Sequence, residues 1–114
     1  MDIIRIQDIA AHDGKEITLQ GWVYNRTAKG KLAFLLVRDG SGFAQCVAFK
    51  GDLDEATFEQ IAHIPQESSV VITGTVRKDE RAPGLPGGYE IGISAFSVIQ
   101  AADENYPMAL KEHG

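Results

Sequence analysis

The chain has 114 residues, of which 44% are apolar and 24% charged, as is typical of one soluble globular domain. No apolar run approaches the roughly 18 residues of a membrane span, and the N-terminus lacks the basic-then-apolar layout of a secretory signal. A single cysteine, Cys46, excludes an internal disulfide and fits a reducing compartment. We therefore expect a cytoplasmic protein with no membrane partner.

The net charge of −5 is unfavourable for a nucleic-acid-binding protein, which usually displays a basic surface. The charges are, however, unevenly distributed along the chain. Residues 22–50 carry five cations against one anion, whereas residues 51–67 carry five carboxylates and neither Lys nor Arg. This segregation predicts one basic and one acidic face, although chance alone could produce it in so short a chain.

Strand signals recur at regular spacing. The first, residues 16–26, is rich in β-branched and aromatic residues. Two more, residues 31–39 and 42–49, are joined by Asp-Gly-Ser-Gly, and the last two, 69–79 and 88–100, flank a Pro/Gly-rich loop. A short helix is expected near residues 6–11. A longer helix is predicted over residues 52–65, where Asp52 and Glu55 form a capping-box-like start and Pro65 ends the segment.

Five strands with one helix between the third and fourth are the layout of an OB-fold, a small Greek-key barrel. A generic five-stranded barrel of the SH3 type fits less well, because it seldom carries a full helix at that point. The loops of an OB-fold and its second and third strands commonly bind oligonucleotides. The predicted fold class is therefore all-β with one helix, a five-stranded OB-fold Greek-key barrel.

The hairpin formed by residues 31–49 allows two registers. A turn at Asp39-Gly40 sets Phe34 opposite Gln45, whereas a turn at Gly40-Ser41 sets Leu36 opposite Gln45. Side chains alternate between faces with a period of two, so both registers keep Phe34 and Gln45 on one face. The opposite face is wholly apolar and mostly small, as a tight barrel interior requires. Its residues are Ala33, Leu35, Val37, Ala44, Cys46 and Ala48.

Phe34 and Gln45 are thus predicted to lie outside the barrel. An unpaired base would suit this pair, because the ring offers a stacking surface and the amide can hydrogen-bond a base edge. Alternatively, Phe34 covers the barrel under a loop or under the N-terminal segment. Spacing alone does not choose between the two readings.

The stretches "GWVYNR…GKLAFLLVRDGSGFAQCV" and "ITGTVRKD" resemble the N-terminal anticodon-binding domain of the class II aminoacyl-tRNA synthetases for aspartate, asparagine and lysine. The C-terminal "NYPMALKEHG" is similar to the hinge that precedes the catalytic domain in the asparagine enzymes. The resemblance implies an anticodon-binding domain over residues 1–102 and a hinge over residues 103–114. It also implies a longer parent enzyme, an asparagine–tRNA ligase that is a homodimer and uses ATP and Mg to charge tRNA(Asn).

The resemblance also assigns roles to single residues. Phe34 would stack on the middle anticodon base, a uridine, and Gln45 would hydrogen-bond its edge. Arg26 would support the same nucleotide or its phosphate, and Glu90 would contact a flanking anticodon base. Backbone contacts are expected from basic side chains, namely Lys29, Lys31, Arg77 and Lys78. Arg77 and Lys78 are adjacent on one strand, so at most one of them can point at the ligand.

No catalytic residue and no metal site is expected in this chain, because no nucleophile–base pair occurs and the three histidines lack ligand spacing. No cofactor is expected in this domain. Three alternatives remain open from the sequence. The chain could be a free-standing OB-fold protein that coats single strands, the same domain of an aspartate–tRNA ligase, or a protein–protein module that uses Phe34 and Phe43 as an apolar patch.

Overall fold

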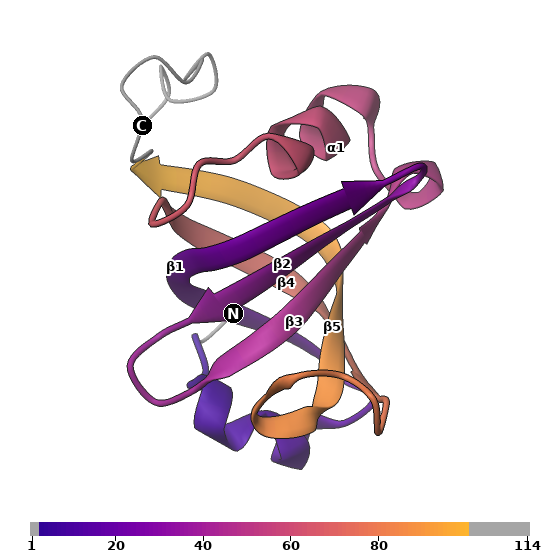
Figure 1. The fold of residues 1–114 in the computed structure, drawn as a ribbon. Helices are drawn as coiled ribbons and strands as arrows, with labels where there is room; N and C mark the ends of the chain where they lie inside the picture. Colours follow the sequence, from indigo (N-terminus) through magenta and orange to yellow (C-terminus); the bar gives the residue numbers. More distant parts are fainter. Residues whose placement is uncertain (1–2, 101–114) are drawn as a thin grey trace.

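Five strands close into a barrel in the computed structural model, which describes residues 3–100 (Figure 1). The strands are β1 (Glu16–Lys29), β2 (Leu32–Arg38), β3 (Phe43–Phe49), β4 (Ser69–Lys78) and β5 (Gly84–Gln100). They follow one another around the barrel in the order β1-β2-β3-β5-β4. β3 and β5 pair in parallel, and all other neighbours pair antiparallel. This topology confirms the predicted OB-fold.

Helical segments lie at the two ends of the barrel (Figure 1). The α-helix α1 (Glu55–Ala62) joins β3 to β4, as predicted, and follows a short 3₁₀ helix, Lys50–Asp52. A second 3₁₀ helix, Ile6–His12, precedes β1 at the other end. The helix expected near residues 6–11 is therefore present. The expected hinge, residues 103–114, lies outside the described residues.

The start of α1 differs from the expected capping box. Asp54 is the N-cap, since its carboxylate accepts hydrogen bonds from the Thr57 backbone N–H and hydroxyl at 3.3 and 2.6 Å. These bonds lower the pKa of the Asp54 carboxyl. The prediction of Asp52 and Glu55 was wrong because Asp52 belongs to the preceding 3₁₀ helix. Asp54 satisfies the same requirement for a side-chain acceptor at the first free N–H groups.

The β2–β3 hairpin adopts the second of the two predicted registers. Leu36 lies opposite Gln45, and Phe34 lies opposite Val47. The turn is at Gly40-Ser41, where only Gly40 has a positive φ, of 91°, as a type II′ turn requires. Asp39 instead closes the hairpin with its side chain, which accepts from the Ser41 N–H and hydroxyl and from the Ile6 N–H.

The six residues that the alternation placed inside the barrel all belong to its core. Ala33, Leu35, Val37, Ala44, Cys46 and Ala48 are all buried. At one end of the barrel the 3₁₀ helix Ile6–His12 buries Ile6 and Ile9, and at the other end α1 buries Phe58 and Ile61. Burial, with a smaller contribution from the charge of Glu90, raises the pKa of the Cys46 thiol to about 12. The thiol is therefore a neutral packing group.

Candidate nucleic-acid interface

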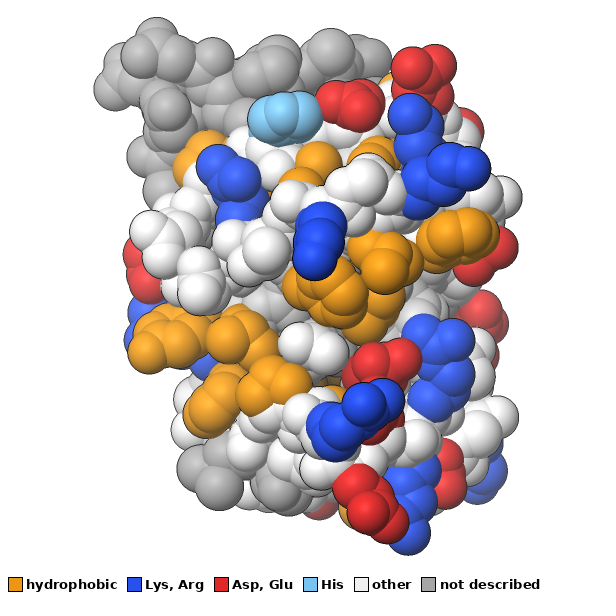
Figure 2. Space-filling view, turned by 45° about the vertical axis from the view of Figure 1, so that its right-hand side comes forward, with side chains coloured by type: hydrophobic (Ala, Val, Ile, Leu, Met, Phe, Trp, Pro, Cys, Tyr) orange, Lys and Arg blue, Asp and Glu red, His pale blue; other side chains and the backbone are white. Residues whose placement is uncertain are grey.

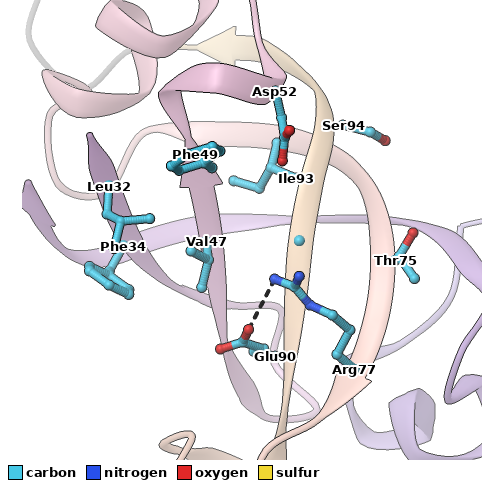
Figure 3. A pocket seen from close by; sticks show the side chains of 11 residues that line it. Leu32, Phe34, Val47, Phe49, Asp52, Thr75, Arg77, Glu90, Ile93 and Ser94 are labelled. Atoms are coloured by element: carbon cyan, nitrogen blue, oxygen red, sulfur yellow. Dashed lines mark ion pairs between the residues drawn. The ribbon is translucent and has the colours of Figure 1, made fainter.

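A groove of about 630 Å³ runs across the outer face of four neighbouring strands (Figures 2 and 3). Hydrophobic side chains gather on the face shown in Figure 2, with basic and acidic side chains around them. The residues that line the groove come from β2, β3, β5, β4 and the 3₁₀ helix after β3. They are Leu32, Phe34, Val47, Phe49, Asp52, Thr75, Arg77, Glu90, Gly92, Ile93 and Ser94. We call this site the outer-face groove.

Strand pairing explains why these residues meet. One row crosses the sheet from Phe34 to Val47, then to Gly92 and Thr75, because each is the register partner of the next. Residues directly opposite in a sheet lie on the same face. The four residues of this row therefore all face the groove. In Figure 3, Phe34 and Arg77 lie on opposite sides of Val47. The small residues in the middle of the row leave the space that forms the groove.

The first wall is apolar and aromatic. Phe34 is half-buried, whereas Leu32 and Phe49 beside it are 37% and 43% exposed. Large apolar side chains that stay this exposed on a sheet face indicate a binding surface. Phe34 therefore lies where the alternation predicted, outside the barrel and not under a loop of the described chain.

The second wall is an ion pair between adjacent strands. Arg77 and Glu90 are register partners, and Nη2 of the guanidinium lies 3.0 Å from the Glu90 carboxylate (Figure 3). The Glu90 side chain is only 17% exposed, whereas that of Arg77 is 54% exposed. Both therefore offer polar groups at the groove surface. Lys78 pairs with Tyr89 and alternates to the other face, so Arg77 is the one that faces the groove.

Gln45 lies at the border of the groove. Its register partners are Leu36 on β2 and Glu90 on β5, and its side chain is half-buried on the outer face. Phe34 and Gln45 thus share a face, as predicted, but are separated along the strands by one residue pair. Gln45 and Glu90 place an amide and a carboxylate side by side, which can together donate to and accept from a base edge.

Arg26 lies away from the groove, at the C-terminal end of α1. Its Nε donates to the Ile64 carbonyl at 2.6 Å and its Nη1 to the Ala62 carbonyl at 3.1 Å. A β-bulge between Val23 and Asn25 shifts the alternation of β1 by one residue. Arg26 therefore shares the face of Leu35, and Thr27 takes the position opposite Phe34.

Three lysines lie at one end of the groove. Lys29 is the register partner of Leu32, and Lys31 occupies the turn between β1 and β2. The backbone N–H of Lys50 donates to the Lys31 carbonyl at 2.8 Å, which places Lys50 in the same cluster. The groove itself is lined by two carboxylates, Asp52 and Glu90, and one guanidinium. The lysines thus add positive charge at the rim, whereas the groove lining carries two carboxylates against one guanidinium.

Several lining residues were not predicted from the sequence. Phe49 follows Gln45 and Val47 at a spacing of two, so the alternation that revealed Phe34 could have found it. Thr75 could have been found in the same way from Arg77. Asp52 and Gly92 carry no local signal, because their place depends on the 3₁₀ turn after β3 and on the β3–β5 register.

Comparison with known proteins agrees with the OB-fold. The family model described as "OB-fold nucleic acid binding domain" matches residues 17–99. The asparagine–tRNA ligase of Roseiflexus castenholzii is 51% identical over 109 residues, which cover 96% of this chain and 24% of that protein. This chain therefore spans about a quarter of the length of that relative.

Two solved structures extend the comparison. The asparaginyl-tRNA synthetase from Pyrococcus horikoshii, complexed with asparaginyl-adenylate, matches 91% of this chain and 24% of that chain, with a TM-score of 0.82 and 40% identity. The aspartyl tRNA synthetase from Entamoeba histolytica matches 94% of this chain and 22% of that chain, with a TM-score of 0.76 and 25% identity. The resemblance to these synthetases that the sequence indicated is confirmed.

Proposed function

Because the chain belongs to the family of OB-fold nucleic acid binding domains, we propose that it is the anticodon-binding domain of an asparagine–tRNA ligase. Its ligand is the anticodon loop of tRNA(Asn), held in the outer-face groove. The observation that carries this proposal is the groove itself, with an aromatic wall facing a polar one across a floor of small residues. Single-stranded RNA is bound in this way, by stacking of splayed bases and hydrogen bonds to their edges.

Each predicted site residue has a role in this proposal. Phe34 stacks on the middle base, and Gln45 at the border of the groove hydrogen-bonds its edge. Glu90, with Arg77, contacts a flanking base. Phosphates follow the lysines at the rim, Lys29 and Lys31, with Lys50 added by the structure.

Two of the predicted contacts are farther from the groove. Arg26 reaches the same nucleotide or its phosphate only with those of its five donors that do not bond the Ala62 and Ile64 carbonyls. Lys78, on the face opposite to Arg77, acts through its charge on the RNA backbone and not as a groove residue.

The rest of the ligase follows from the same proposal. Residues 1–102 form the anticodon-binding domain, and residues 103–114 form a hinge toward a catalytic domain. Transfer of asparagine to the tRNA, with ATP and Mg, belongs to that catalytic domain, and the whole enzyme is a cytoplasmic homodimer. Within residues 3–100, no helix is long and apolar enough to cross a membrane. We propose an asparagine rather than an aspartate ligase because, of the two solved structures compared above, the asparaginyl-tRNA synthetase is 40% identical to this chain and the aspartyl tRNA synthetase 25%.

Fluorescence anisotropy with labelled RNA hairpins tests the proposal. The tRNA(Asn) anticodon stem-loop should bind more tightly than a hairpin with the same stem and a scrambled loop of equal length. A protein that coats single strands would bind both loops and an unpaired oligonucleotide alike, and a protein–protein module would bind none of them. Either of these results would refute the assignment.

A further inference from the structure

Gly92 lies on the floor of the outer-face groove, between Val47 on β3 and Thr75 on β4. Its φ is not in the left-handed region, so the backbone of β5 does not itself require glycine here. An alanine could adopt the same conformation. The absence of a side chain at residue 92 is therefore explained by the group that occupies the space where a Cβ would lie.

The Arg77 guanidinium occupies that place. A Cβ built on Gly92 would lie 2.9 Å from Nη2, 3.0 Å from Cζ and 3.5 Å from Nε of Arg77. These are the atoms of the planar group that pairs with Glu90 at 3.0 Å. Gly74 is different, because there a Cβ would meet the backbone carbonyl of Gly92, which cannot move without breaking the sheet. A methyl group at residue 92 can be accommodated, but only if Arg77 moves.

We propose that Gly92 is a positioning residue for anticodon recognition. By leaving the surface of β5 open, it lets the Arg77 guanidinium lie across the strand beside Glu90. This inference rests on the proposed function, since the ion pair is the polar wall that contacts the flanking base. The guanidinium then presents its remaining donors to the groove in one fixed orientation. The same ion pair compensates the negative charge of Glu90, which would otherwise lie unpaired in the groove.

A side chain at residue 92 should therefore change recognition through Arg77. Pushed from the strand, Arg77 loses the fixed orientation of its donors, and the Glu90 carboxylate faces the negatively charged RNA without its partner. Binding of the stem-loop should weaken by about tenfold, the loss of one base-edge contact. Discrimination at the flanking base should weaken with it, whereas discrimination at the middle base should persist.

A double-mutant cycle tests this coupling. The variants are Gly92→Ala, Arg77→Ala and the double variant, and Val47→Ile is the control that adds one methyl group to the same floor. Melting temperature and affinity for stem-loops with the flanking base changed are measured on each variant. The NMR signal of Arg77 Nε–Hε without RNA is measured on the original chain, on Gly92→Ala and on Val47→Ile, which keep Arg77. We expect Gly92→Ala to fold, to shift the Arg77 signal and to lose affinity. In the Arg77→Ala background, it should cost less than twofold.

Two results would overturn the inference. Equal losses from Gly92→Ala with and without Arg77 would mean that the methyl group merely fills the groove, as it should in Val47→Ile. An unchanged Arg77 signal in folded Gly92→Ala would mean that Gly92 does not position the guanidinium. If the original chain fails to prefer the stem-loop, the proposed function fails instead, while the Arg77 signal still tests the contact without RNA.

Discussion

Replacing Phe34 with alanine should weaken binding of the anticodon stem-loop by removing the aromatic wall of the outer-face groove. Stacking of one base on an aromatic side chain contributes about 1–3 kcal/mol. The dissociation constant should therefore rise about 5- to 160-fold. Phe34 is only half-buried and lies opposite Val47 on an open face, so truncation leaves no enclosed cavity. A fully buried phenylalanine costs about 3–5 kcal/mol, and we expect about half of that in the free energy of unfolding here.

Phe43→Ala is the matched control. Phe43 lies on the same face and is also half-buried, but its ring contacts Tyr24, at 6.1 Å between centroids, outside the groove. Both variants should lose similar stability in urea unfolding, whereas only Phe34→Ala should lose affinity in anisotropy titrations at fixed salt. If Phe34→Ala binds like the original chain, or if Phe43→Ala loses as much, the groove is not where the base stacks.

Three further predictions concern the base edge, the phosphates and the β2–β3 turn. Changing the middle uridine to cytidine should weaken binding, and in Gln45→Ala this loss of affinity should be smaller in the same titration. An unchanged loss would exclude Gln45 as the residue that recognises the middle base. The slope of log affinity against log salt should be near −2, from about two or three phosphate contacts at about −0.7 each. Lys29→Ala with Lys31→Ala should flatten this slope and weaken binding to all loop sequences equally. A slope that the two substitutions leave unchanged would place the RNA elsewhere on the barrel. Burial alone would raise the pKa of Asp39, but hydrogen bonds from Ser41, Ile6 and Gly42 outweigh it and lower the pKa. The ionised carboxylate therefore stabilises the fold above about pH 4. Asp39→Asn should lower the free energy of unfolding by about 1–3 kcal/mol at pH 7 in urea unfolding, and the difference between the two chains should vanish as the pH falls through the lowered pKa. A loss of stability that does not depend on pH would contradict this role.

The barrel and its inner face could be predicted from the sequence because both depend on local alternation. Residues 31–49 alternate small apolar residues with larger or polar ones, and only one face could fill a tight interior. The register of the hairpin could not be decided in the same way, since Asp39-Gly40 and Gly40-Ser41 are both acceptable turns. The structure uses Gly40-Ser41 because the Asp39 carboxylate bonds Ser41 and the distant Ile6.

The candidate site was only partly predictable. Phe34, Arg77 and Glu90 line the groove and Gln45 lies beside it. Alternation predicted the outer face for Phe34 and Gln45, whereas only the resemblance pointed to Arg77 and Glu90. Arg26 does not, because a bulge in β1 reverses its side, and no local pattern marked that bulge. The proximity of Gly92 and Arg77 joins β5 to β4 across the loop of residues 79–83, so it depends on the register between the two strands and not on spacing within either one.

The central claim is that the anticodon loop lies in the outer-face groove. It is tested most directly by titrating the tRNA(Asn) anticodon stem-loop into the isotope-labelled chain and mapping the amide and methyl shifts by NMR. The account predicts that the largest changes cluster on the groove residues, led by Leu32, Phe34, Val47 and Gly92, with smaller changes at the lysine rim. Changes centred instead on the exposed surface around Trp22, with the groove signals unmoved, would contradict it.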